Sequence, residues 1–89
     1  MAFKNLDPKQ YGLSSRIQLR QGDADDIFIV INRKSRLIMK DGSRIVEQAQ
    51  KIRGVHTQSI ISVLTSAPVC SKTRVFLKGH GIEIEKLDL

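Results

Sequence analysis

The sequence predicts a small α/β fold: a three-layer sandwich with a largely parallel central sheet and the element order β-β-(β)-α-β-α-β. Two runs of largely apolar, mostly β-branched residues, at 27–31 and 60–65, are typical of strands covered on both faces. Each run precedes a segment with apolar residues at helical spacing. Strands that alternate with helices favour parallel pairing. The 89 residues suffice for one such unit and are too few for two.

The first 26 residues contain one predicted strand. Residues 1–14 include a proline and little apolar periodicity, so we expect a flexible N-terminal arm ahead of a single domain at 15–89. Residues 15–20 alternate apolar and polar side chains, which predicts a half-exposed strand. The glycine and aspartates at 21–26 indicate a turn before the central strand.

The middle of the chain predicts a helix. Residues 36–40 are interpreted as a short extended piece, and Asp41 and Ser43 offer the side-chain acceptors that favour a helix start. A helix is expected at 44–53, and Gly54 follows as a stop signal. One face of this helix is apolar and comprises Ile45, Val46, Ala49 and Ile52.

The last third repeats the pattern of strand, helix and strand. The buried strand at 60–65 leads to Pro68, a residue favoured in the first turn of a helix. We expect the second helix at 69–79. Alternating residues at 82–85 then predict an edge strand.

Positive charge is concentrated in the middle of the chain. The formal net charge is +6, from 15 Lys and Arg against 9 Asp and Glu. Residues 33–53 alone hold seven cations and two acids, which favours binding to a polyanion because clustered charge raises the local potential. The cations of this segment are Arg33, Lys34, Arg36, Lys40, Arg44, Lys51 and Arg53.

The residues that catalysis or metal binding would need are sparse. Cys70 is the single cysteine, and His56 and His80 lie far apart without zinc-type spacing. No activated nucleophile, Walker loop or Rossmann fingerprint is present. We therefore predict that the domain is not an enzyme and has no cofactor or metal site. With no apolar run of about 20 residues and no signal peptide, we expect a cytoplasmic protein without a membrane partner.

Two loops form the candidate binding site. In open α/β sheets, ligands sit beyond the carboxyl ends of the strands, where loops enter helix N-termini. The loop at 32–43 is rich in Arg and Lys, and the loop at 65–73 is rich in hydroxyl groups, so a phosphate backbone is expected to bridge them. The candidate residues are Arg33, Lys34, Arg36, Lys40, Gly42, Ser43, Arg44, Ser66, Ser71, Lys72 and Thr73.

Residues 27–84 resemble the Pelota-type RNA-binding domains, from the superfamily of the kink-turn-binding ribosomal proteins. The motifs that carry the resemblance are Phe28-Ile29-Val30-Ile31, Ile38-Met39-Lys40-Asp41-Gly42, Ile61-Ser62-Val63-Leu64-Thr65 and Ala67-Pro68-Val69-Cys70-Ser71-Lys72-Thr73. The resemblance implies that RNA backbone meets the turn from Lys40 to Arg44 first, and then residues 67–73. The Gly-x-Asn-Glu signature of kink-turn binders is absent after Gly42. Such domains also occur beside phosphoribosyltransferase-like proteins, so the resemblance implies a protein partner of that kind.

Two alternative functions remain open. The C-terminal third also looks like the opening of a glutaredoxin, with Ala67-Pro68-Val69-Cys70 in place of Cys-x-x-Cys, which would make the chain a degenerate redox domain lacking the first cysteine. The other alternative is a basic protein-interaction module or accessory subunit that binds an acidic partner. Competition between RNA and duplex DNA separates this module from a specific RNA-binding domain.

Overall fold

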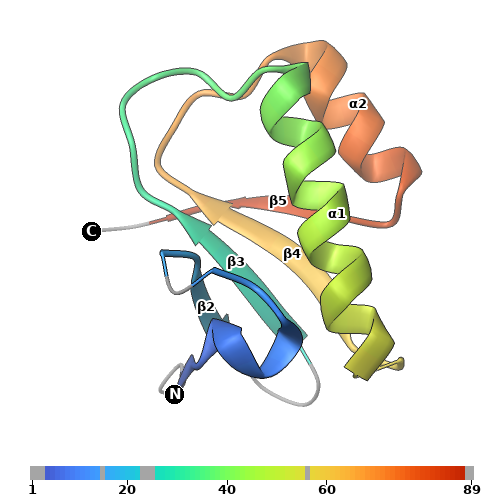
Figure 1. The fold of residues 1–89 in the computed structure, drawn as a ribbon. Coiled ribbons are helices and arrows are strands. Elements are labelled where there is room, and N and C mark those ends of the chain that lie inside the picture. Colours follow the sequence, from blue (N-terminus) through green and yellow to red (C-terminus); the bar gives the residue numbers. More distant parts are fainter. Residues whose placement is uncertain (1–3, 15, 23–25, 56, 88–89) are drawn as a thin grey trace.

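The computed structural model describes residues 4–14, 16–22, 26–55 and 57–87, and it confirms the α/β class (Figure 1). The fold contains five strands, two α-helices and one 3-10 helix in the described residues. In chain order they are β1 (Lys4–Leu6), η1 (Pro8–Tyr11), β2 (Gln18–Gln21), β3 (Asp26–Ile31), α1 (Met39–Val55), β4 (Ile60–Thr65), α2 (Ser71–Gly79) and β5 (Glu83–Lys86).

The five strands form one mixed sheet in the order β1-β2-β3-β4-β5. β1, β2 and β3 are an antiparallel meander, whereas β3, β4 and β5 run parallel. Ile29 at the centre of β3 lies opposite Leu19 of β2 and Val63 of β4. The parallel half is the part linked by helical crossovers, as the alternation of strands and helices predicts.

Both helices cover the same face of the sheet (Figure 1). The crossovers through α1 and α2 step in the same direction across the sheet, so crossovers of the same hand place both helices on one side. Within the described residues the helices therefore form one layer, and the predicted three-layer sandwich is corrected to a sheet with a single helical layer. The opposite face carries a smaller buried cluster of Phe28, Val30, Leu64 and Leu87.

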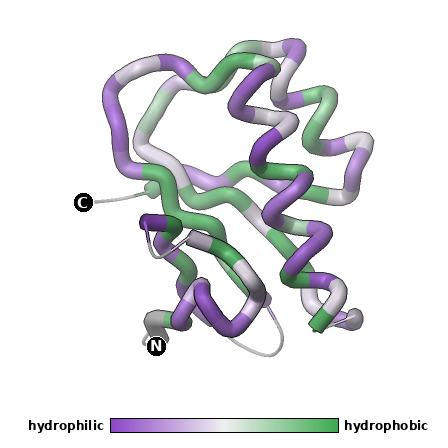
Figure 2. Tube along the Cα trace, viewed as in Figure 1, coloured by the Kyte–Doolittle hydropathy of each residue, from purple (hydrophilic) through white to green (hydrophobic). Residues whose placement is uncertain are grey.

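The main core lies between the sheet and the helices. In β3, Ile27 and Ile29 point to the helical layer and Phe28 and Val30 to the other face, so all four are buried. In Figure 2 the central strands β3 and β4 are largely hydrophobic, whereas the helices alternate between hydrophobic and hydrophilic residues. The helices contribute five buried core residues, Ile45, Val46, Ala49, Ile52 and Leu77.

The predicted N-terminal arm is wrong for residues 4–14, which belong to the fold. Leu6 of β1 pairs with Leu19 of β2, and Tyr11 and Leu13 are only 5% and 7% exposed in the main core. The Asp7 carboxylate accepts a hydrogen bond from the Lys9 backbone N–H and caps η1. These elements are three and four residues long, too short for periodicity to reveal them. Residues 1–3 lie outside the described residues.

The helix α1 begins earlier and ends later than the predicted 44–53. It starts at Met39 because the Asp41 carboxylate accepts the Ile38 backbone N–H at 2.9 Å, which is capping-box geometry with Asp41 as the third helical residue. Asp41 therefore caps the helix from inside rather than preceding it, and Gly54 lies within the helix. The extended piece predicted at 36–40 is reduced to a single bridge residue, Leu37.

The other elements lie within three residues of their predicted bounds, and the strand at 60–65 matches its prediction at both ends. The turn predicted at 21–26 falls partly outside the described residues, as does His56. None of the described helices is long and apolar enough to cross a membrane.

Candidate nucleic-acid interface

The loops that follow β3 and β4 are joined to each other by backbone hydrogen bonds. The Leu37 N–H donates to the Pro68 carbonyl at 2.8 Å, and the Cys70 N–H donates to the Leu37 carbonyl at 3.0 Å. Leu37 is fully buried and forms a parallel bridge with Val69. The two predicted site loops therefore lie side by side, as expected. We call loops 32–38 and 66–70, with the first turns of α1 and α2, the carboxyl edge.

Side chains at the strand ends add further links between these loops. The Thr65 hydroxyl donates to the Ile31 carbonyl at 2.7 Å and accepts the Ala67 N–H at 3.0 Å. The Ser66 hydroxyl donates to the Asn32 amide oxygen at 2.8 Å. Ser66, a candidate ligand residue, thus holds the two loops together and remains exposed at the surface.

Arg33 organises the loop after β3. One terminal nitrogen lies 2.6 Å from the Asp41 carboxylate and donates to the Arg36 carbonyl at 3.1 Å, while Nε donates to the Ser35 carbonyl at 3.2 Å. The Arg33–Asp41 contact is the one ion pair formed by the described residues. Arg33 was predicted to contact the ligand directly, but its guanidinium is largely committed to holding its own loop.

The Asp41 carboxyl has a lowered pKa. Burial acts to raise the pKa, but the hydrogen bonds from the Ile38 N–H and from Arg33, with the charges of Arg33 and Arg44, outweigh burial. The ionised carboxylate therefore stabilises the fold at neutral pH.

Replacing Asp41 by Asn should lower the free energy of unfolding by about 1 kcal/mol at pH 7, because the helix start loses its charged acceptor. The folded-state pKa lies below the ordinary value of 3.8, so the contribution is full above that value and is lost as pH falls through the folded-state pKa. Urea unfolding of both proteins between pH 7 and pH 2.5 measures it. A difference that stays constant down to pH 2.5 would show that the charge has no role.

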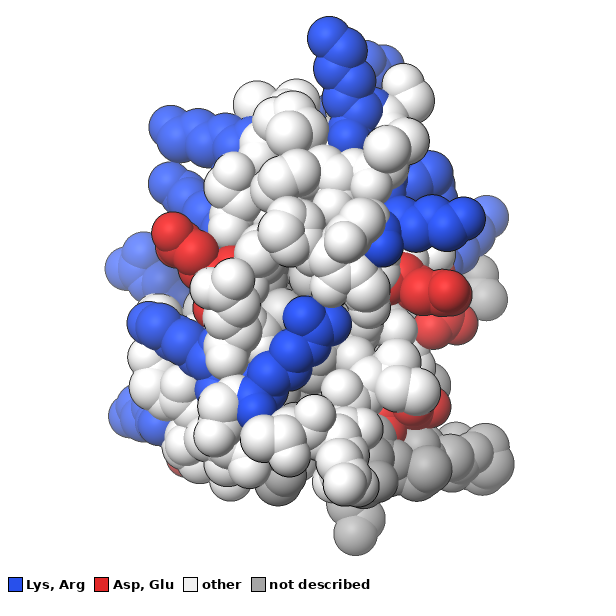
Figure 3. All heavy atoms as spheres, turned by 90° about the vertical axis from the view of Figure 1, so that its right-hand side faces the viewer, with Lys and Arg blue, Asp and Glu red and all other residues white. Residues whose placement is uncertain are grey.

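Few acidic residues lie near the exposed cations of the carboxyl edge in the sequence. Between residues 32 and 46 Asp41 is the only acid, and there is none between 66 and 82. Figure 3 shows the side of the molecule with the helices: Lys and Arg lie over the whole height of this face, and its upper part, toward the carboxyl edge, carries no Asp or Glu among the residues drawn in colour. The exposed cations from the two segments' loops and first helical turns are Lys34, Arg36, Lys40, Lys72 and Arg74.

Two candidate ligand residues lie inside the protein. Gly42 is buried on α1, where an added Cβ would meet Thr73 at 3.1 Å and Phe76 at 3.2 Å. Thr73 is itself fully buried. Both residues form the contact between α1 and α2, so neither is available to a ligand. Ser43 and Ser71, by contrast, are exposed beside the cations.

Cys70 precedes α2 and is partly buried. The backbone amides of Lys72 and Thr73, and more weakly the Thr73 hydroxyl and the Arg36 charge, lower the pKa of its thiol despite some desolvation. A lowered pKa is what the redox alternative requires, but position 67 holds alanine where a dithiol would need a second cysteine. The redox alternative stays a prediction. Among the described residues no group of three His, Cys, Asp or Glu side chains is arranged to hold a metal ion.

A cavity of about 250 Å³ lies between β2, β3 and α1, next to the carboxyl edge. Its walls contain three arginines, of which Arg16 was not among the predicted site residues. Arg16 could not be selected from the sequence because the cations and acids of the first 26 residues cancel. Its place beside α1 depends on the pairing of β2 with β3. We call this space the arginine cavity; its lining is Arg16, Ile17, Gln18, Ile29, Val30, Ile31, Arg33, Leu37, Asp41, Arg44, Ile45 and Gln48.

Two solved structures share this fold. The first is EndoMS in its apo form, with a TM-score of 0.69 over 100% of this chain, and the second is a complex of EndoMS with double-stranded DNA, with a TM-score of 0.72 over 98%. Both are 14% identical in sequence to this chain, which spans only 38% and 37% of their lengths. No protein-family model and no curated protein matches the chain. The resemblance to Pelota-type domains stays a prediction that neither structure tests.

Proposed function

We propose that this domain is a non-catalytic module that binds nucleic acid by its phosphate backbone, with the carboxyl edge as the contact surface and duplex DNA as the first ligand to test. The exposed cations of this surface lie next to the N-termini of both helices. This combination of amides and cations suits phosphate oxygens.

The observation that carries the proposal is the position of two lysines. Lys40 is the second residue of α1, and Lys72 is the second residue of α2. A cation in the first turn of a helix is unfavourable, since the helix dipole is positive there, by about 0.3–1 kcal/mol each. Both lysines are exposed, and neither has an ion-pair partner among the described residues. An external polyanion accounts for this placement.

Duplex DNA is the preferred ligand because a solved structure with the same fold is a complex with double-stranded DNA. RNA is the second candidate, and the resemblance of residues 27–84 to Pelota-type domains favours it. Backbone contacts alone do not separate the two ligands, because DNA and RNA share the phosphate groups. A protein partner, phosphoribosyltransferase-like or otherwise acidic, remains the third prediction.

Fluorescence anisotropy with duplex DNA, structured RNA and single-stranded RNA tests the proposal. We expect micromolar binding of duplex DNA, and five phosphate contacts give a slope of roughly −4.5 for log K against log salt. Tighter binding of structured RNA would favour the second candidate, and a flat salt dependence with no preference would contradict backbone binding. Incubation of the duplex with protein and Mg²⁺ should leave both strands intact.

A further inference from the structure

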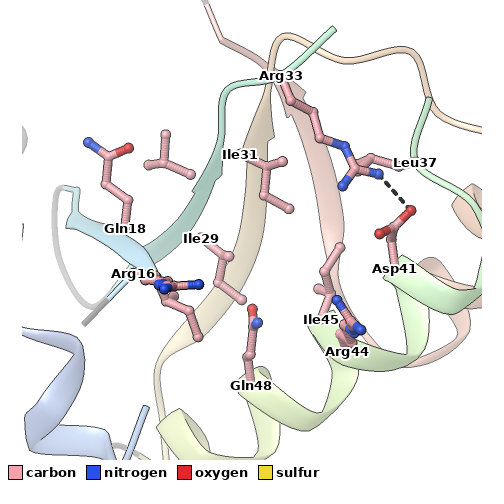
Figure 4. A pocket seen from close by; sticks show the side chains of 12 residues that line it. Arg16, Gln18, Ile29, Ile31, Arg33, Leu37, Asp41, Arg44, Ile45 and Gln48 are labelled. Carbon is pink, nitrogen blue, oxygen red and sulfur yellow. Dashed lines mark hydrogen bonds and ion pairs between the residues drawn. The ribbon is translucent and has the colours of Figure 1, made fainter. Parts of the chain in front are cut away.

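The arginine cavity concentrates positive charge beside an apolar floor. Figure 4 shows Arg16 on the β2 side and Arg44 on α1, with Gln48 between them and Ile29, Ile31 and Ile45 along the wall. The cavity is thus lined for a ligand that has both an anionic and an apolar part. Its volume of about 250 Å³ lies below the roughly 300–1,000 Å³ of pockets for drug-sized molecules.

The charges in the cavity wall do not balance. Its three arginines face one acid, Asp41, which is paired with Arg33 at 2.6 Å. Within the described residues, the guanidinium groups of Arg16 and Arg44 have no hydrogen-bond acceptor, although the Asp41 charge also acts on Arg44. Two positive charges in excess remain beside a cavity of limited size.

We infer that the arginine cavity binds a phosphate monoester at the end of a nucleic-acid strand, with part of the adjoining nucleoside against the isoleucines. A monoester carries a charge of about −1.5 to −2 at pH 7, which matches the two excess arginine charges, whereas each phosphodiester inside a strand carries one. Paired guanidinium groups also suit phosphate oxygens geometrically.

The cavity adjoins the surface proposed for the strand. Arg33 and Leu37 line the cavity and belong to loop 32–38, which also carries the exposed Lys34 and Arg36. A strand that lies along the carboxyl edge can therefore end in the cavity without crossing another element. In this form the inference rests on the proposed nucleic-acid binding and adds recognition of strand ends to it.

The test compares duplexes of one sequence with a 5′-phosphate, a 3′-phosphate or hydroxyl ends only, by fluorescence anisotropy at pH 7. We expect one phosphorylated duplex to bind about tenfold more tightly than the hydroxyl duplex, the effect of one charge-assisted contact. The preference should shrink at pH 5, because the second pKa of the monoester is about 6. Equal affinities for all three duplexes at pH 7 would overturn strand-end binding.

The matched variants are Arg16→Gln with Arg44→Gln, against Arg74→Gln. Arg16, Arg44 and Arg74 are all exposed, so folding should be preserved, which thermal melting checks. The double variant should bind phosphorylated and hydroxyl duplexes equally, whereas Arg74→Gln, in the first turn of α2 and outside the cavity, should weaken binding of all duplexes alike and retain the preference. A preference that survives in the double variant would overturn the assignment to this cavity.

A free nucleotide also carries a phosphate monoester and is the alternative ligand for the arginine cavity. If all duplexes bind equally, yet a nucleoside 5′-monophosphate raises the melting temperature of the wild type and not of the double variant, the cavity binds free nucleotides and strand-end binding is overturned. Absence of both effects overturns the phosphate site altogether. Loss of all duplex binding contradicts the proposed function, whereas duplex binding without end preference contradicts only this inference.

Discussion

Replacing Gly42 by Leu should lower the free energy of unfolding by about 3 kcal/mol, the upper part of the usual range for overpacking a core. An added Cβ would already lie 3.1 Å from a methyl carbon of Thr73 and 3.2 Å from the Phe76 ring. The larger side chain must therefore push α1 and α2 apart or adopt a strained rotamer. Urea unfolding of the purified variant measures the change.

Gly54→Leu is the matched control on the same helix. An added Cβ at Gly54 meets nothing within 4 Å, and removing a glycine from a helix is favourable, so stability should rise by about 0.5 kcal/mol. If Gly42→Leu is as stable as the wild type, Gly42 does not serve as the contact between the helices. The earlier interpretation of Gly42 as a ligand-binding turn would then regain support.

Replacing Lys40 and Lys72 together by Ala should weaken binding to duplex DNA on the order of 50-fold at 0.1 M salt. The slope of log K against log salt should become shallower by about 2, because each lost phosphate contact removes about 0.9 from it. Both lysines lie in first helical turns, so their removal should leave the melting temperature unchanged or slightly higher. A loss of binding without a loss of stability identifies contacts with the ligand.

Lys78→Ala is the control for removal of a single charge. Lys78 is exposed in the last turn of α2, at the opposite end of that helix from Lys72. Its replacement should change affinity about threefold or less and leave the salt slope unaltered, as expected for a distant, screened charge. If Lys72→Ala and Lys78→Ala weaken binding equally, the attraction is diffuse and the carboxyl edge has no special role.

The predictable part of the fold is the part with strong hydrophobic periodicity. The run at 60–65 is bounded by polar residues and becomes β4 at the predicted limits. The layer arrangement was not predictable in the same way, because it depends on strand order, which no local pattern encodes. The start of α1 was not predicted correctly because Asp41 and Gly42 are both common just before a helix. Here both lie inside the helix: Asp41 accepts the capping hydrogen bond from the Ile38 N–H, and Gly42 allows the close approach of α2.

The candidate site was predictable at the level of loops and less so at the level of side chains. Charge and topology placed both loops at one edge, and the Leu37–Val69 bridge confirms their contact. Which residues face outward depends on tertiary packing: Thr73 is buried against α1, and Arg33 is occupied by Asp41. Arg16 joins the arginine cavity only through the pairing of β2 with β3.

The measurement that tests the central claim most directly is amide chemical-shift mapping of the ¹⁵N-labelled domain during titration with duplex DNA. The account predicts the largest shifts in loops 32–38 and 66–70 and in the first turns of α1 and α2. Shifts centred on η1 and on residues 79–83, at the opposite edge of the sheet, with the carboxyl edge unaffected, would contradict it.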